Sequence, residues 1–116
     1  YGHAVGDKVI IAIAETIKKS CRDKDVIFRL GGDEFAIFMP GMVEQKTAEK
    51  FFERLFGNIR QIDIVEMQGK SITISMGACF YDGDEKVSFD HLYRNADSVM
   101  YQSKEKQGCS AMIYGR

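Results

Sequence analysis

The residues best suited to chemistry form a short acidic turn, Gly31-Gly32-Asp33-Glu34, between two apolar runs. These runs, Val26–Phe28 and Phe35–Met39, are rich in β-branched and aromatic residues, which is typical of buried strands. Glycines adopt positive φ and carry no side chain, so a phosphate group can approach their backbone closely. Adjacent carboxylates are oxygen ligands of the kind that Mg²⁺ takes beside substrate phosphates. This four-residue hairpin connection therefore predicts either a phosphate and metal site or an ordinary polar hairpin tip.

The turn is part of a longer pattern, RLGGDEF over Arg29–Phe35, followed by an apolar strand and Pro40-Gly41. This pattern resembles the signature hairpin of the GGDEF family, the diguanylate cyclases. Two other stretches resemble family motifs at the expected distances: GHxxGD over Gly2–Asp7 and ADxxMYxxK over Ala96–Lys104. The resemblance extends over the whole chain.

The resemblance implies an enzyme of bacterial second-messenger signalling that condenses two GTP molecules into cyclic di-GMP and pyrophosphate. It implies that Asp33 binds Mg²⁺ or Mn²⁺ and is a candidate general base, with Glu34 as a helper or a structural residue. Gly31 and Gly32 make room for the nucleotide. Arg29 lies near the site in the family, although an arginine at a strand end is usually a surface cation.

The same resemblance assigns nucleotide contacts outside the hairpin. Asp7 is expected to read guanine, since a carboxylate accepts hydrogen bonds from the N1 and N2 donors; His3 is a weaker choice. The alternative for Asp7 is a helix N-cap. Lys104 is expected to reach the phosphates, the alternative being a solvent-exposed helical lysine. Family members often continue with Gly-Arg-Asn, whereas this chain has Gly108-Cys109-Ser110, so Lys106 is the candidate for a second phosphate contact.

An Arg-x-x-Asp pattern, formed by Arg22 and Asp25, lies just before the signature hairpin. It resembles the family's inhibitory site, which binds product dimers away from the catalytic centre. The planar fork of an arginine suits both a guanine edge and a phosphate. Short patterns of this type also arise by chance in charged loops. Only the position of this pattern relative to Gly31 distinguishes it from a chance match.

The composition and charge of the chain limit the kinds of partner that it can bind. The 116 residues are 45% hydrophobic and 11% aromatic, with sixteen basic and seventeen acidic residues and a net charge of −1. Without a polybasic run, a nucleic-acid polymer or a membrane surface is an unsuitable partner, whereas GTP and cyclic di-GMP need only a few placed cations. Three widely spaced cysteines fit a reducing compartment. We therefore expect a cytoplasmic domain, free or in a membrane-anchored sensor. The family resemblance implies that it dimerises for catalysis and follows a sensory domain.

Periodicity predicts a single α+β domain over residues 1–116. Helices are expected at about 6–20, 44–59 and 89–106, the last with Ser88 as N-cap and Gly108 as its end. Its buried stripe is expected to comprise Phe89, Leu92, Ala96, Val99 and Met100. Besides the hairpin, strands are expected at 71–78 and 111–114, with a weaker candidate at 62–66. The resemblance implies a mainly antiparallel, palm-like sheet related to nucleotide cyclases, with a ferredoxin-like core.

The family's first strand, with its own aspartate, lysine and asparagine, does not occur in this chain, and no Asp-x-Asp-x-Phe stretch replaces it. We therefore expect residues 1–116 alone to be inactive, with exposed strand edges that promote association. Two functions stay open for the parent protein. One is a diguanylate cyclase, and the other is a non-catalytic module that binds GTP or cyclic di-GMP and regulates a partner.

Overall fold

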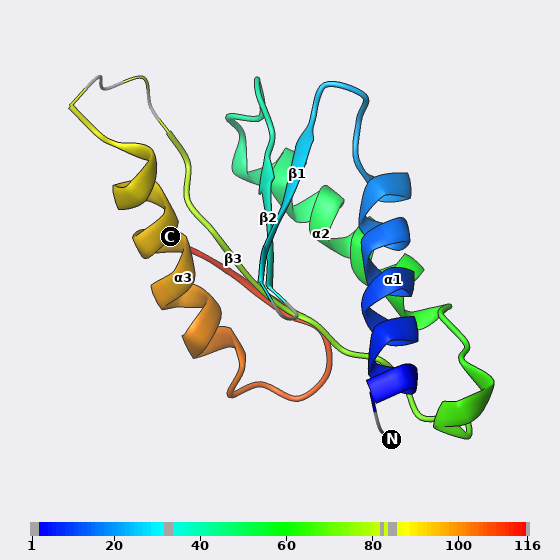
Figure 1. The fold of residues 1–116 in the computed structure, drawn as a ribbon. Helices are drawn as coiled ribbons and strands as arrows, with labels where there is room; N and C mark the ends of the chain where they lie inside the picture. The colour runs from blue at the N-terminus through cyan, green and yellow to red at the C-terminus, as the bar shows by residue number, and fades with distance from the viewer. Residues whose placement is uncertain (1–2, 32–33, 82, 84–85, 116) are drawn as a thin grey trace. The chain divides into compact units, whose positions relative to one another are not determined.

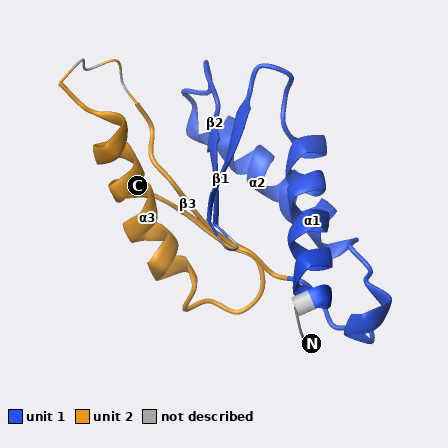
Figure 2. Ribbon diagram, viewed as in Figure 1, with its two compact units in different colours: residues 1–72 blue, residues 73–116 orange. Residues whose placement is uncertain are grey.

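The computed structural model describes residues 3–31, 34–81, 83 and 86–115 (Figure 1). The described residues form three α-helices, one short 3₁₀ helix and four strands. The chain divides into two compact units, residues 1–72 and residues 73–116 (Figure 2). Within the described residues, no helix has both the length and the apolar character needed to cross a lipid bilayer.

The first unit is built on two packed helices, α1 (His3–Ser20) and α2 (Gln45–Arg60). Helix α2 follows the prediction to within one residue, and its apolar residues recur on one side. The buried apolar residues of this unit come mainly from that stripe: Ile17, Ala48, Phe51, Leu55, Phe56, Ile59 and Ile72.

Side chains of α2 also close the carboxyl end of α1, where carbonyl groups lack helical partners. Arg54 donates from Nη2 to the Ser20 carbonyl oxygen at 2.9 Å, and Asn58 donates from Nδ2 to Ser20 Oγ at 2.9 Å. Ser20 in turn donates to the Thr16 carbonyl at 2.8 Å. The buried Ser20 is therefore fully engaged, and the two helices are held at a defined register.

The signature turn joins two antiparallel strands, β1 (Val26–Gly31) and β2 (Glu34–Phe38). The pairing runs farther into the connection than predicted, because Gly31 pairs with Glu34 and only residues 32–33 lie between the strands. The register slips between Arg29 and Gly31, which makes Leu30 an extra residue on β1. Such a bulge lets the ladder continue to the turn while it changes the local twist.

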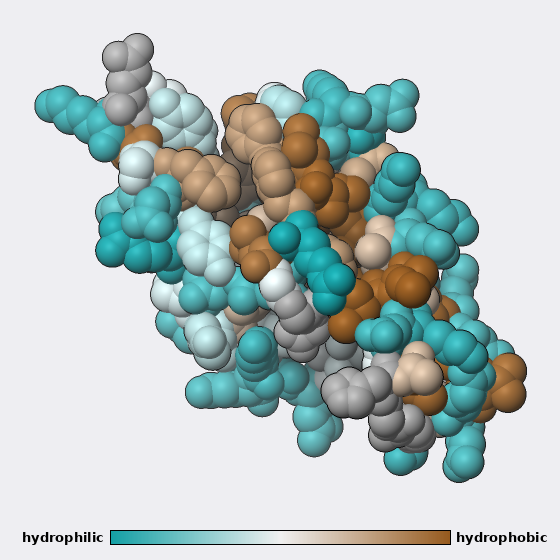
Figure 3. All heavy atoms as spheres, in the orientation of Figure 1, coloured by the Kyte–Doolittle hydropathy of each residue, from teal (hydrophilic) through white to brown (hydrophobic). Residues whose placement is uncertain are grey.

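The prediction that both hairpin strands are buried is wrong. Val26, Phe28 and Leu30 alternate along β1 and share a face with Phe38, which pairs with Val26. These four side chains are between 41% and 53% exposed. Apolar side chains accordingly gather at the surface over the hairpin in Figure 3. An apolar run indicates extended backbone, but it does not reveal whether an element covers both faces.

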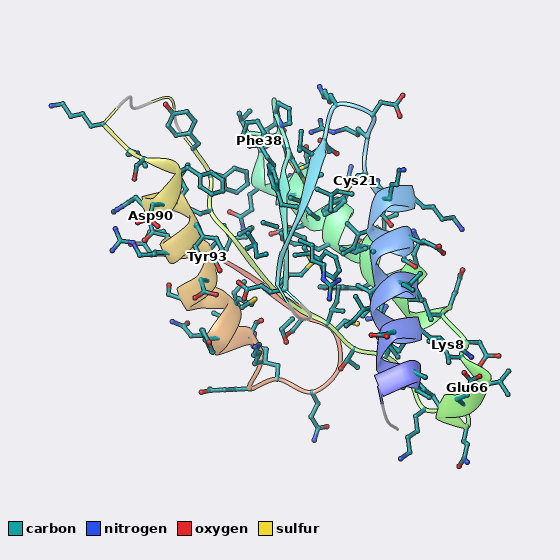
Figure 4. The ribbon with its side chains drawn as sticks, viewed as in Figure 1. Lys8, Cys21, Phe38, Glu66, Asp90 and Tyr93 are labelled. Carbon is teal, nitrogen blue, oxygen red and sulfur yellow. The ribbon has the colours of Figure 1, made fainter. Side chains whose placement is uncertain are left out.

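The weaker strand predicted at 62–66 does not form. Ile64 is extended, but the chain then enters the 3₁₀ helix η1 (Val65–Met67) and reverses through Gln68 and Gly69, both with positive φ. The turn is closed by hydrogen bonds inside the segment, including Gln68 N to Val65 O at 3.0 Å. Glu66 also forms an ion pair with Lys8 of α1 (Figure 4). These local bonds take the place of a strand ladder.

The second unit contains a parallel strand pair, β3 (Ser75–Ala78) and β4 (Ser110–Ile113), connected by α3 (Phe89–Ser103). Parallel strands need a crossover connection, which α3 provides. The strand predicted at 71–78 keeps only its second half, because β4 is a four-residue partner. Main-chain bonds from Ser110 N to Ile74 O and from Tyr114 N to Ala78 O extend the pairing at each end.

Gly77 lets α3 approach β3 unusually closely. A Cβ atom at this position would lie 1.9 Å from the Ala96 carbonyl oxygen and 2.6 Å from the Met100 nitrogen. Both contacts are with the helix backbone, which cannot move aside as a flexible side chain would. The absence of a side chain at Gly77 therefore sets the short distance between β3 and α3.

The ends of α3 agree only partly with prediction. Ser88 is the N-cap as expected, accepting a hydrogen bond from His91 N at 3.1 Å. Phe89, expected to be buried, is 63% exposed because it occupies the first helical position. The helix ends at Ser103 rather than Lys106. There, Ser110 Oγ donates to the Ser103 carbonyl at 2.7 Å and so satisfies a terminal carbonyl group.

Candidate functional site

The end of the hairpin presents an open backbone beside a carboxylate. Gly31 has φ +146°, and among the described residues, its chain neighbours aside, no atom lies within 4 Å of the position that a Cβ would occupy. Its partner across the ladder is Glu34, a half-buried residue that begins β2. Gly32 and Asp33, which carry the predicted nucleotide and metal contacts, lie outside the described residues. The described part of the turn thus offers space at the backbone and one acidic side chain.

Arg29 is two residues from Gly31 on β1 and directly precedes the bulge. It is exposed and lies opposite Phe35 in the ladder. The structure therefore brings Arg29, Gly31 and Glu34 to the same end of one hairpin, as the sequence predicts. A cation and a carboxylate there supply both signs of charge around the open backbone.

Helix α1 begins at His3, three residues earlier than predicted, so Asp7 lies inside the helix. The alternative interpretation of Asp7 as an N-cap is therefore wrong. His3 begins the helix, four residues before Asp7. Asp7 is exposed, and the neighbouring Lys8 is paired with Glu66. The hydrogen bond from Lys8 holds the pKa of Glu66 below its usual value.

Lys104 belongs to the second unit, where it forms the C-cap of α3. Its side chain is exposed, and Nζ lies 4.9 Å from the centroid of the Tyr101 ring. No carboxylate among the described residues forms an ion pair with this ammonium group. Lys104 is thus a cation held against an aromatic ring at a helix end.

The predicted inhibitory pair, Arg22 and Asp25, is brought together in a closed turn. Arg22 donates from its backbone nitrogen to Asp25 Oδ2 at 2.7 Å, and from Nη2 to Oδ1 at 2.7 Å. Nη2 also donates to the Pro40 carbonyl at 3.0 Å, which ties the turn to the segment just after β2. The Asp25 side chain is 0% exposed and that of Arg22 is 33% exposed. Only the arginine therefore faces a ligand in solution.

Charge and burial act in opposite directions at this pair. Burial by itself would raise the pKa of Asp25, but the hydrogen bonds and charge of Arg22 outweigh it and lower that pKa. The same hydrogen bond raises the pKa of Arg22. Burial, followed by the charge of Asp25, raises the pKa of the adjacent Cys21 thiol. Asp25 is therefore anionic throughout the neutral range.

A pH-dependent stability follows from this pair. Because the pKa of folded Asp25 lies below the unfolded value of about 3.8, its stabilising effect is complete above that pH. The effect is lost as the pH falls through the folded pKa. We expect Asp25→Asn to flatten the fall in the free energy of unfolding below about pH 4, measured by urea titration at each pH.

Asp90→Asn is the matched control, because Asp90 also pairs with an arginine, Arg94, at 3.2 Å. That pair is 76% and 70% exposed, so its loss should leave the pH profile nearly unchanged. Equal pH profiles for wild type and Asp25→Asn would show that the Arg22–Asp25 pair does not stabilise the fold.

Two further features concern ligands. No group of three or more His, Cys, Asp or Glu residues suited to a metal occurs in the described ranges.

The second unit contains a small cavity of about 180 Å³, which sequence reasoning missed because its lining comes from three separate segments. The lining residues are Cys79, Phe80, Tyr81, Val87, His91, Leu92, Asn95 and Tyr114. Its volume is below that of ordinary small-molecule sites.

Comparison with known proteins identifies the family. Residues 1–109 match the family described as "Diguanylate cyclase, GGDEF domain". The chain belongs to the GGDEF family. The resemblance deduced from the signature hairpin is therefore confirmed, and the match also includes the Gly2–Asp7 and Ala96–Lys104 stretches.

Relatives of this GGDEF chain include the diguanylate cyclase DgcM of Escherichia coli, 32% identical over 90% of the chain. The bifunctional diguanylate cyclase and cyclic di-GMP phosphodiesterase MucR of Pseudomonas aeruginosa is 36% identical over 91% of it. The chain spans only 24% and 15% of those two proteins. It therefore corresponds to a minor part of each.

A solved structure of the GGDEF domain of TpbB (YfiN) from Pseudomonas aeruginosa has the same fold. It is 28% identical, with a TM-score of 0.82 over 97% of this chain and 66% of that one. The predicted α+β class with a palm-like, cyclase-related architecture is thereby confirmed.

Proposed function

We propose that this chain provides catalytic residues of a diguanylate cyclase, which condenses two GTP molecules into cyclic di-GMP. The 3′-hydroxyl of each GTP attacks the α-phosphate of the other, and each attack releases pyrophosphate. The observation that carries the proposal is the hairpin end, where the open backbone at Gly31 pairs with Glu34. The two adjacent acids of the sequence, Asp33 and Glu34, favour the enzyme over a module that only binds nucleotide.

The acidic turn fits a divalent cation, Mg²⁺ or Mn²⁺. Mg²⁺ takes one or two carboxylates together with substrate phosphates and water, and Asp33 and Glu34 supply carboxylates of that kind. When bound, the cation would neutralise phosphate charge that develops during the attack. Asp33 is proposed as cation ligand and candidate base, with Glu34 beside it and Gly31 and Gly32 giving the phosphates access to the backbone.

The remaining contacts are assigned to residues that present charge to solvent. Asp7 is exposed on α1 and would accept hydrogen bonds from guanine, with His3 one turn before it. Lys104 would donate to the phosphates, and Arg29 would contribute positive charge at the hairpin. The reaction joins two nucleotides head to tail, so we propose that two copies of the domain face each other. We propose a cytoplasmic location, because the substrate GTP is supplied there.

Turnover of GTP by the full-length protein tests the proposal. Incubation with GTP and Mg²⁺, followed by chromatography and mass spectrometry, should reveal cyclic di-GMP. ATP under the same conditions should give no cyclic dinucleotide, because its N1 and C2 positions lack the donors that Asp7 would recognise. Tight GTP binding without any product would favour the non-catalytic module instead.

Product feedback through Arg22 is part of the proposal. Because Asp25 is covered and Arg22 is partly exposed, the guanidinium would contact cyclic di-GMP while Asp25 holds it in place. We expect Arg22→Ala to weaken cyclic di-GMP binding by about tenfold or more, as expected for loss of a charge-assisted contact. Isothermal titration calorimetry of the wild type and variant measures this directly.

Arg60→Ala is the control, because Arg60 is an exposed arginine at the end of α2. It should bind cyclic di-GMP as the wild type does. GTP turnover should persist in Arg22→Ala, since the residue is assigned no role in catalysis. Equal affinities in Arg22→Ala and wild type would make the Arg-x-x-Asp pattern a structural turn only.

A further inference from the structure

The end of α3 holds a lysine against an aromatic ring that the core does not use. Tyr101 and Lys104 are three residues apart and therefore lie on one helical face. Nζ of Lys104 is 4.9 Å from the Tyr101 ring centroid, within the range of a cation–π interaction. Tyr101 is 62% exposed, so burial of its ring contributes little to the packing of α3.

The backbone beneath this pair is fixed. Ser103, immediately before Lys104, is fully buried, and its Oγ donates to the Met100 carbonyl at 2.9 Å. Ser110, which begins β4, donates to the Ser103 carbonyl at 2.7 Å. Lys104 N also closes a helical bond to Met100 O at 3.1 Å. The ring and the ammonium therefore project from a hydrogen-bonded base, and the lysine stem has the rotatable bonds.

We propose that Tyr101 is a positioning residue, which holds the Lys104 ammonium in place before a nucleotide triphosphate binds. The inference rests on the proposed function, in which Lys104 contacts phosphate. A lysine side chain loses much rotamer freedom when its ammonium is fixed on a ligand. The ring restricts that freedom in advance, and it occupies only one side of the ammonium, leaving N–H donors for phosphate oxygens.

The test uses equilibrium binding of guanosine 5′-[α,β-methylene]triphosphate to the full-length protein by calorimetry, since its bridging methylene prevents turnover. Tyr101→Leu removes the aromatic face and keeps an apolar side chain, and affinity should fall about two- to fivefold. Tyr101→Phe keeps the face and should bind as the wild type does. The affinity of Lys104→Met for the analogue should be lower by about tenfold or more. The double variant should bind no more weakly than Lys104→Met, because the ring acts only through the ammonium.

Phe89→Leu controls for loss of an exposed ring elsewhere on α3 and should leave affinity unchanged. If Lys104→Met binds as the wild type does, the phosphate contact of the proposed function is wrong, and the positioning role falls with it. If Lys104→Met binds the analogue weakly while Tyr101→Leu binds it as the wild type does, the phosphate contact stands and the positioning role is overturned. Failure of Tyr101→Phe to retain affinity, or additive losses in the double variant, would equally overturn it.

Discussion

Asp33→Asn should reduce cyclic di-GMP synthesis by the full-length protein by at least about 100-fold. Asparagine has nearly the same shape as aspartate and is also a favoured turn residue, so the hairpin should keep its conformation. It lacks the negative charge that would hold the proposed divalent cation and the basicity that would receive a proton. The loss should therefore appear in kcat with folding intact, as checked by circular dichroism and product chromatography.

Asp63→Asn is a suitable control, because Asp63 is an exposed aspartate in the loop after α2. It removes the same charge from the chain and should leave turnover unchanged. Wild-type turnover in Asp33→Asn would contradict the role assigned to the acidic turn. A loss of equal size in Asp63→Asn would attribute the effect to net charge.

Gly77→Ala should destabilise the protein by about 3 kcal/mol. The added methyl group would overlap the Ala96 carbonyl oxygen, 1.9 Å away, so α3 would have to move off β3. That displacement would strain the β3–α3–β4 crossover and carry Lys104 with it. The free energy of unfolding from urea titration, followed by circular dichroism, measures the cost.

Gly57→Ala makes the same substitution with the opposite expected sign. Gly57 lies inside α2, and outside the helix's own backbone no atom of the described residues is within 4 Å of the added methyl group. Alanine should therefore stabilise the helix by about 0.5–1 kcal/mol through its higher helix propensity. Unchanged stability in Gly77→Ala would mean that α3 and β3 do not approach as closely as the structure shows.

Local sequence signals predicted the elements whose evidence lies within a few residues. The apolar stripe of α2 and the N-cap at Ser88 are of this type, and both agree with the structure. The hairpin was also located correctly, because two glycines between β-branched runs specify a turn. Its bulge at Leu30 was not predicted, since a bulge depends on the register between two strands.

Errors arose where partners distant in sequence decide the outcome. The apolar residues of β1 gave no sign of which face is covered, and Phe28 proved to be 41% exposed. The end of α3 depends on a hydrogen bond from Ser110, seven residues farther along the chain. The parallel pairing of β3 with β4 depends on the α3 crossover.

The candidate site shows the same division. The resemblance to the family's inhibitory site indicated Arg22 and Asp25 as a pair, and the structure brings them into a closed turn. The acceptor at Pro40, eighteen residues away, and the complete covering of Asp25 could not be read from a four-residue pattern. The ring of Tyr101 under Lys104 was likewise overlooked, because a tyrosine and a lysine three residues apart on a helix are ordinary surface residues.

The most direct test of the central proposal is the stoichiometry of the reaction catalysed by the full-length protein. GTP consumed, pyrophosphate released and cyclic dinucleotide formed are measured together in one reaction with Mg²⁺. Condensation of two nucleotides predicts two pyrophosphates for each cyclic di-GMP, with no cyclic mononucleotide. Pyrophosphate release accompanied by cyclic GMP, or GTP binding with no release at all, would contradict the assignment of this chain as a diguanylate cyclase domain.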